Sequence, residues 1–329
     1  MTQDKRLLSG MRPTGRLHLG HYKVIKEWAR LCDIYDCYWF TADWHAITTQ
    51  FDNTDNIAAN RREIVIDWLS AGLDPDKCHI FHQSDIKEHA ELHLLFSMIT
   101  PLSWLERVPT YKGQLEAFKE KGKDIATYGF LGYPLLMAAD ILMYRPSGVP
   151  VGEDQAPHVE FCRELLRRFH HLYDCEVFPE PQPVFNHIEI LPGTDNRKMS
   201  KSYDNFILLS ATAGQVKDKV WAMVTDPARI RKTDPCQPDI CAVYAYHGFF
   251  NKDEQPQICA DFQAGAIGCG QCKKRLTDCL NDFLEPMRER RAKYEANPAL
   301  LDEIIAAGND TARATARETM ELVRAAMKV

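Results

Sequence analysis

Apolar and polar residues follow two alternating patterns up to about residue 195. Short apolar runs predict buried strands at residues 6–10 ("RLLSG"), 37–42 ("CYWFTA") and 78–83 ("CHIFHQ"). Between these runs, apolar residues recur at helical spacing over residues 20–32, 56–72 and 89–100. Strands that alternate with helices of this length predict β-α-β units and a parallel sheet. Ligands of such sheets bind at the carboxyl ends of the strands.

The strand signals fade after about residue 205, and the remaining apolar patterns are helical. Helices are expected within residues 213–224, 272–297 and 314–329. The pattern therefore predicts an α/β protein with two domains. Residues 1–195 would form a Rossmann-like parallel-sheet domain, and residues 196–329 an all-helical domain.

Composition agrees with this division and narrows the class of protein. A chain of 329 residues is long enough for two domains, and 45% apolar with 26% charged residues is typical of a globular protein. The net charge of −6 excludes a general attraction for nucleic acid, so such binding would need local basic patches. The sequence contains neither a bilayer-spanning apolar run nor a secretory signal in "MTQDKRLLSGM". We therefore expect a cytoplasmic protein without a membrane partner.

The first predicted strand leads into a loop that has the chemistry of a phosphate site. In "SGMRPTGRLHLGHYKVIKEW" (residues 9–28), His18 and His21 flank Gly20 where a helix begins. A helix N-terminus offers free N–H groups to an anion, and Gly20 allows a ligand to approach the backbone closely. The imidazoles would donate hydrogen bonds to a polyphosphate. The alternative is that the histidines only cap a surface helix.

A second segment, "TDNRKMSKSYDN" at residues 194–205, places cations in a loop without an apolar anchor. Lys198 and Lys201 carry compact positive charges on flexible stems, which suits them to a departing phosphate group. Alone, the segment could equally be a solvated basic turn.

Together the two segments resemble the signatures of class I aminoacyl-tRNA synthetases, with "HLGH" at residues 18–21 and "KMSKS" at residues 198–202. In amino-acid activation an ionised carboxylate attacks the α-phosphorus of ATP, so no general base is needed. The enzyme must supply positioning and neutralise charge on the leaving phosphates. The resemblance implies that His18, His21, Lys198 and Lys201 stabilise the transition state, with Mg²⁺ accompanying ATP.

A carboxylate in an apolar helix indicates the substrate class. Asp140 lies between Ala139 and Ile141 in a helix expected from Pro134, and Met137 shares its face. A buried carboxylate is costly unless it is paired. It could meet a backbone N–H or an arginine, or it could accept a polar hydrogen from a large aromatic substrate. This reasoning does not separate an indole N–H from a phenol O–H.

The pattern "MAADI" followed by "VPVGEDQ" resembles the tryptophanyl members of the family, and the similarity covers nearly the whole chain. It implies a ligase that activates L-tryptophan with ATP and then transfers it to tRNA(Trp). It also implies a homodimer formed through an insertion in the catalytic domain, with the anticodon read by the helical domain. The tryptophan site would comprise Asp140 on the indole nitrogen, with Met137, Tyr133, Val149, Val151, Gln155, His45 and Gly10. The ATP site would comprise Arg12, Pro13, Thr14, Gly20, His21, Gly152, Glu153, Asp154, Ile188, Lys198, Met199, Ser200, Lys201 and Ser202.

Several of the eleven cysteines fall in one C-terminal stretch and predict a metal or cluster site. Some bacterial tryptophanyl enzymes, which this stretch resembles, carry a [4Fe–4S] cluster on a C-x22-C-x6-C-x2-C pattern. Here nine residues separate the second and third cysteines, and Phe262 occupies the expected position. An iron–sulfur cluster, a zinc ion and free thiols therefore stay open. The candidate ligands are Cys236 or Cys241, with Cys259, Cys269 and Cys272.

Three other functions fit part of the sequence. A non-catalytic tRNA-binding relative would usually have lost the phosphate-handling residues, and all four are present. A tyrosyl relative would keep both signatures but should differ around Asp140. A nucleotidyltransferase that shares only the histidine segment would lack the dilysine loop and the helical domain.

Overall fold

The computed structural model describes residues 5–120, 122–185, 191–226, 229, 231, 234 and 237–329. Within these residues the centre of the fold is a five-stranded sheet in the order β3-β2-β1-β4-β5, and all neighbouring strands are parallel. The strands are β1 (Arg6–Met11), β2 (Asp36–Thr41), β3 (Cys78–His82), β4 (Gly148–Val151) and β5 (Gln182–Phe185). The predicted parallel α/β sheet is confirmed.

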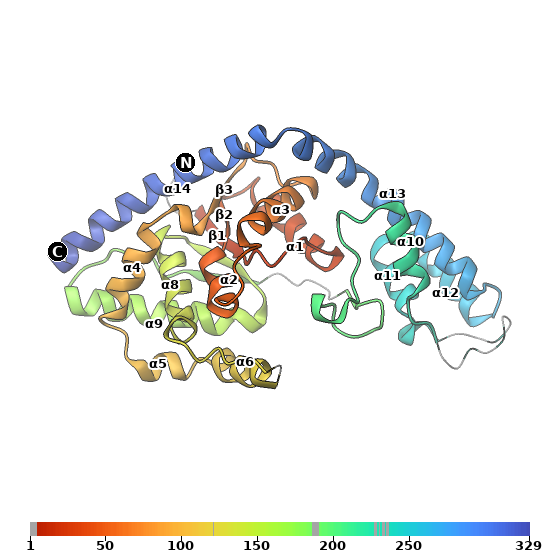
Figure 1. Cartoon of the computed structure of the whole chain (residues 1–329), viewed down its shortest axis with the longest axis horizontal. Helices are drawn as coiled ribbons and strands as arrows, with labels where there is room; N and C mark the ends of the chain where they lie inside the picture. The colour runs from red at the N-terminus through yellow and green to blue at the C-terminus, as the bar shows by residue number, and fades with distance from the viewer. Residues whose placement is uncertain are drawn as a thin grey trace.

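Helices connect these strands and continue to the C-terminus (Figure 1). In the described part of the first half they are α1 (Leu19–Leu31), α2 (Asp43–Gln50), α3 (Ile57–Ser70), α4 (Glu88–Ser97), α5 (Leu102–Glu106), α6 (Pro109–Glu120), α7 (Tyr128–Leu131), α8 (Tyr133–Met143) and α9 (Ala156–Tyr173). They are followed by α10 (Ala213–Trp221), α11 (Ala242–Phe250), α12 (Gln255–Gln263), α13 (Cys269–Ala296) and α14 (Pro298–Met327). Short 3-10 turns are η2 (Gln83–Asp85), η3 (Glu153–Gln155), η4 (Lys201–Tyr203) and η5 (Pro238–Ile240).

Alternate strand residues enter two separate apolar cores, as the two-residue period of a strand requires. Leu7 and Trp39 pack in one core with α1 and α3, where the Trp28 ring stacks on Trp39 at 4.5 Å. Leu8 and Tyr38 pack in the other core with α4, α8 and α9. Because both faces of the sheet are covered, its strands read as continuous apolar runs, which made the first three strands predictable.

The C-terminal half is helical, as predicted from the loss of strand signals. Helices α10 to α13 pack on the α1 side of the sheet and share its core. The last helix, α14, instead leaves this group and runs back along the part of the molecule that contains the sheet, so that α13 and α14 form an arch (Figure 1). No described helix is both long and apolar enough to cross a membrane.

Helix α14 covers the open edge of the sheet by packing directly on β3. The closest approach is at Gly308, where an added Cβ would lie 1.9 Å from the carbonyl oxygen of Ile80. Next to it, the Asn309 side chain accepts a hydrogen bond from the His82 backbone N–H at 3.2 Å and donates one to Asp85 at 2.9 Å. The edge strand is thus protected by a helix from the far end of the chain.

A buried ion pair joins α13 to the loop before α1. The Arg291 guanidinium donates to Asp67 Oδ1 of α3 at 2.7 Å, and both side chains are buried. The second oxygen of Asp67 accepts the backbone N–H of Leu17 at 2.6 Å. Helix α13 therefore helps to fix the backbone one residue before His18.

Replacing Gly308 with alanine should strongly destabilise the protein, because the clash is with backbone atoms that have no room to move. We expect a loss of about 2–4 kcal/mol in the free energy of unfolding, measured as a lower urea midpoint. The matched control is Gly113→Ala in α6, where an added Cβ meets nothing within 4 Å. That control should be neutral or stabilising by up to about 1 kcal/mol. Equal midpoints for the two variants would contradict the close packing of α14 on β3.

Candidate active site

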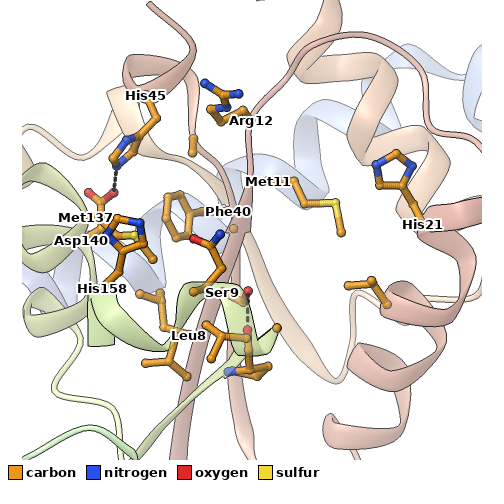
Figure 2. A pocket seen from close by; sticks show the side chains of 18 of the residues that line it. Leu8, Ser9, Met11, Arg12, His21, Phe40, His45, Met137, Asp140 and His158 are labelled. Atoms are coloured by element: carbon orange, nitrogen blue, oxygen red, sulfur yellow. Dashed lines mark hydrogen bonds and ion pairs between the residues drawn. The ribbon is translucent and has the colours of Figure 1, made fainter. Parts of the chain in front are cut away.

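A cavity of about 1180 Å³ opens at the carboxyl ends of β1 and β4. The direction in which strands are added to the sheet reverses between β1 and β4. Strands β2 and β3 are added on one side of β1, and β4 and β5 are added on its other side. Parallel α/β sheets bind ligands at such a reversal. Helix α1 contributes His21 to one side of the cavity, and α8 contributes Asp140 to the opposite side (Figure 2).

Most residues predicted for the two binding sites line this one cavity. They are Gly10, Arg12, His18, Gly20, His21, His45, Tyr133, Met137, Asp140, Val149, Val151, Gly152, Glu153, Gln155, Lys198 and Met199. Pro13, Thr14, Ser200 and Lys201 do not line it. Ile188 lies outside the described residues, as do the side chains of Asp154 and Ser202.

The histidine segment forms a cradle at the start of α1. His21 Nδ1 accepts the backbone N–H of His18 at 3.3 Å, which leaves Nε2 of His21 as the hydrogen-bond donor. The two imidazole centroids are 3.9 Å apart. Among the described residues, the buried Nδ1 atom of His18 has no hydrogen-bond partner. The cradle can therefore offer donors on uncharged rings.

Burial keeps both rings neutral. Burial, with smaller effects of His21 and Lys201, lowers the pKa of His18 to about 3. Burial and then Lys201 lower the pKa of His21 to about 4. At neutral pH the positive charge near this end of the cavity therefore comes from the lysines and not from the imidazoles.

The dilysine loop lies directly against the cradle. The Lys201 ammonium donates to the Thr14 carbonyl oxygen at 3.1 Å. A Cβ added at Gly20 would lie 3.2 Å from Met199 Sδ and 3.0 Å from His18 Nδ1. The absence of a side chain at Gly20 thus lets the two segments meet, as well as leaving space for a ligand.

Two features that the sequence did not reveal hold this arrangement. The buried Asn205 side chain accepts the Ser200 backbone N–H at 2.8 Å and donates to the Lys198 carbonyl at 3.1 Å, which shapes the loop from inside. The backbone after the loop pairs with the cradle through Leu19 N–H to Ile207 O and Leu209 N–H to Leu17 O, both at 2.9 Å. The chain that follows the loop is therefore tied to the cradle by backbone hydrogen bonds.

On the opposite side, the Asp140 carboxylate is fully buried and accepts several hydrogen bonds. His45 Nε2 lies 3.0 Å from one oxygen and His89 Nδ1 lies 2.6 Å from the other. The Gln83 amide donates to both oxygens, at 2.8 and 2.9 Å. Burial alone would raise the pKa of Asp140, but His89 and His45 outweigh it and lower this pKa to about 2. Asp140 is thus a buried anion with imidazole and amide partners, not the backbone or arginine partners considered above.

Aromatic and apolar side chains form the walls near Asp140. Phe130 stacks on Tyr133 at 5.3 Å, and the Tyr133 hydroxyl lies 3.4 Å from His158 Nε2. Phe130, His158 and also Gln114 of α6 line the cavity, and the sequence did not single them out. These three side chains reach the cavity because of how their helices pack, and the sequence pattern does not specify that packing.

The described cysteines do not form the predicted metal or cluster site. Cys272 is buried with its thiol 3.4 Å from His247 Nε2, and the Cys269 thiol lies 3.8 Å from the Arg229 guanidinium. Among the described residues, no three His, Cys, Asp or Glu side chains are arranged to hold a metal ion. Cys241 and Cys259 therefore do not belong to a set of three possible metal ligands within the described part of the chain. Cys236 lies outside the described residues.

Comparisons with known proteins agree with this fold and site. Residues 1–285 match the family model described as "tRNA synthetases class I (W and Y)". The chain is 47% identical to the tryptophan–tRNA ligase of Thermotoga maritima (98% of this chain and 99% of that protein) and 44% identical to that of Aquifex aeolicus (98% and 100%). A crystal structure of tryptophanyl-tRNA synthetase from Campylobacter jejuni, complexed with ADP and tryptophan, superposes with a TM-score of 0.90 at 31% identity, covering 98% of this chain and 100% of that one.

The chain therefore belongs to the class I tRNA synthetases of the tryptophan and tyrosine type.

The neutral histidines of the cradle should make stability depend on pH. In the unfolded chain each ring binds a proton below its ordinary pKa of 6.5, whereas in the folded protein it does so only near pH 3 to 4. The two neutral rings therefore do not lower the free energy of unfolding above about pH 6.5. As the pH falls below that value, this free energy decreases by up to about 1.4 kcal/mol per pH unit for each ring. The His18→Asn/His21→Asn double variant should lose less stability between about pH 7.5 and about pH 5.5 than the parent, by urea unfolding. His171→Asn, at an exposed position, serves as control, and an unchanged pH dependence in the double variant would contradict the burial of the two rings.

Proposed function

We propose that the protein is a tryptophan–tRNA ligase, which forms tryptophanyl-adenylate and pyrophosphate from L-tryptophan and ATP and then charges tRNA(Trp). The observation that carries this proposal is one cavity that has the His18–His21 cradle on one side and the buried Asp140 carboxylate on the other. Relatives that are 43% to 47% identical to this chain over 98% of its length are named tryptophan–tRNA ligases, which supports the proposal.

In the activation step, the carboxylate of tryptophan attacks the α-phosphorus of ATP, the new O–P bond forms and pyrophosphate leaves. The attacking group is ionised at neutral pH, so the protein supplies alignment and charge stabilisation and no general base. His18 and His21 donate neutral hydrogen bonds to the phosphates. Lys198 and Lys201 stabilise the negative charge that develops on the leaving pyrophosphate. ATP enters as its magnesium complex, whose ion neutralises part of the phosphate charge.

The ATP site combines the cradle with the loop after β4. Arg12, Pro13, Thr14 and Gly20 border the nucleotide on the cradle side. Gly152 and Glu153, which line the cavity at the end of β4, contact the ribose and phosphate. Met199 of the dilysine loop lies next to Gly20 and borders the nucleotide from the same side. The other residues that we assign to the ATP site are Asp154, Ile188, Ser200 and Ser202.

The tryptophan site is built on the Asp140 carboxylate, which accepts the indole N–H. The packing of Met137, Tyr133, Val149 and Val151 around the cavity supports this assignment, since these apolar side chains suit a flat indole ring. Gln155 and Gly10 border the same space. His45 already donates to Asp140 from the cavity side, so the indole N–H must share or replace that contact. A substrate that displaces the His45 contact without supplying this hydrogen would leave the carboxylate with one donor fewer and would therefore bind more weakly.

The second half-reaction requires tRNA(Trp) as partner. We assign anticodon recognition to the C-terminal helical region and place the enzyme in the cytoplasm, where tRNA charging serves translation. We also assign a homodimer. Supporting this, the apolar side chains of Leu94 in α4, Met98 directly after α4 and Leu102 at the start of α5 are 54%, 69% and 64% exposed. An exposed apolar surface of this kind is typical of an interface between subunits.

Tryptophan-dependent exchange between pyrophosphate and ATP tests the function directly. The parent enzyme should catalyse it, and Lys201→Ala should lower kcat by about a hundredfold or more with little change in KM for tryptophan, because the ammonium acts on the transition state. Lys217→Ala, an exposed lysine of α10, is the matched control and should match the parent. No exchange by folded parent enzyme would refute the ligase, and exchange that prefers tyrosine would favour the tyrosyl alternative.

Light scattering after size-exclusion chromatography tests the homodimer. Met98→Glu should convert the dimer to a monomer, because a carboxylate would have to be desolvated in the interface. Ile34→Glu replaces a residue that is 49% exposed and lies outside α4 and α5, and it should leave the dimer intact. A parent protein that elutes as a monomer at micromolar concentration would overturn this assignment.

A further inference from the structure

Behind Asp140 of α8, a buried imidazole connects this carboxylate to Tyr144, the residue directly after the helix. Asp140 and Tyr144 are one helical turn apart and therefore lie on the same face. His89 of α4 bridges them, with Nδ1 2.6 Å from the Asp140 carboxylate and Nε2 2.8 Å from the Tyr144 hydroxyl. His89 and Tyr144 are both fully buried. The three groups form a continuous hydrogen-bonded relay inside the core between α4 and α8.

The relay approaches the carboxylate from the side away from the cavity. Asp140 and His45 line the cavity, but His89, Gln83 and Tyr144 are not among its lining residues. His89 therefore has no route to contact a ligand there. Of the three donors to Asp140, His45 lies in front of the carboxylate, and His89 and Gln83 hold it from behind.

The His89 ring lies between a phenol, that of Tyr144, and a carboxylate, that of Asp140. Burial, with a contribution from Asp140, raises the pKa of Tyr144 well above its ordinary value, so the hydroxyl keeps its proton. His89 Nε2 is hydrogen-bonded to that hydroxyl at 2.8 Å. On the other side the ionised Asp140 carboxylate can only accept, so His89 Nδ1 donates the proton of that hydrogen bond.

A purely structural role explains this cluster poorly. Three buried polar groups between two apolar helices are expensive to desolvate, and apolar side chains of similar size would pack at least as well. A complete relay does provide a fixed orientation, since an imidazole held at both nitrogens has no freedom to rotate. The Asp140 oxygens are then held in one position relative to the cavity.

We infer that His89 and Tyr144 are positioning residues that aim the Asp140 carboxylate at the indole N–H of the substrate. The inference rests on the proposed function, because it assumes that Asp140 accepts this hydrogen. The relay acts on the single hydrogen bond that tells tryptophan from an analogue of the same shape without a donor. It thus contributes to specificity without touching the substrate.

The test compares L-tryptophan with 3-benzothienyl-L-alanine, in which sulfur replaces the indole N–H. The readout is kcat/KM for each amino acid in ATP–pyrophosphate exchange, and the ratio of the two values is the discrimination. His89→Leu, which removes both hydrogen bonds of the relay, should lower the discrimination about tenfold to a hundredfold. The loss should appear as a higher KM for tryptophan, with the values for the sulfur analogue nearly unchanged.

Two further variants divide the relay and guard against misfolding. His89→Asn keeps a donor near the position of Nδ1 and should restore part of the discrimination lost in His89→Leu. Tyr144→Phe removes only the hydroxyl and should lower the discrimination about threefold to tenfold. Asp140→Asn sets the upper limit of the effect, because it alters the acceptor itself. All variants are compared by thermal unfolding before kinetic assay.

Two consecutive residues of α11, a tyrosine and a histidine, serve as matched controls for the relay. His247 and Tyr246 are buried like His89 and Tyr144 but do not line the cavity. His247→Asn should lower thermal stability, whereas Tyr246→Phe removes a buried hydroxyl that has no hydrogen-bond partner among the described residues and should not. Neither variant should change the discrimination.

The outcomes separate the inference from the proposed function. Equal losses for tryptophan and the sulfur analogue, or no change in discrimination for folded His89→Asn and Tyr144→Phe, would make the relay merely structural and overturn the inference while the ligase stands. Absence of tryptophan-dependent exchange in the parent would reject both.

Discussion

The fully buried charge of Asp140 is the constraint that shapes the substrate side of the cavity. An ion inside an apolar helix costs several kcal/mol unless other groups replace its water shell. Its donors come from α2, η2 and α4, and the first two of these follow β2 and β3 directly in the chain. The carboxyl edge of a parallel sheet is where such segments emerge together. The cost of the charge is therefore offset only when this part of the fold is complete.

The phosphate side depends on contacts between segments that are far apart in the sequence. The cradle at Leu17 to Leu19 pairs with the backbone that follows the dilysine loop, and Asp67 holds it from behind with Arg291 of α13. Residues near positions 17, 67, 208 and 291 thus meet at one point. The helical region is consequently part of what fixes the cradle, although the sequence presents it as a separate unit.

The sequence allowed prediction of the parallel sheet, the helical C-terminal half and most cavity-lining residues, because continuous apolar runs and local motifs carry that information. The short strand β4 was missed, since Pro150 and the motif that follows it obscure its pattern. His89, Gln83 and Asn205 were missed because a polar residue looks the same in sequence whether exposed or buried against a partner. The roles assigned to individual site residues and the boundary at residue 195 stay predictions. The return of α14 to β3 has no signal in the helical pattern itself.

The two sides of the cavity differ in charge, and this difference gives a reason for the direction in which tryptophan binds. The Asp140 end is negative, whereas Lys198 lines the cavity from the dilysine loop and the cradle histidines stay neutral. In the proposed reaction, the amino-acid carboxylate is repelled from Asp140 and attracted toward the lysine side, while the indole N–H is attracted to Asp140. Both interactions turn the reacting oxygen toward the phosphates. The orientation of tryptophan and the recognition of its indole ring are then results of the same charge separation. The neutral imidazoles of the cradle preserve this separation because they add no third charge between the Asp140 side and the lysine side of the cavity.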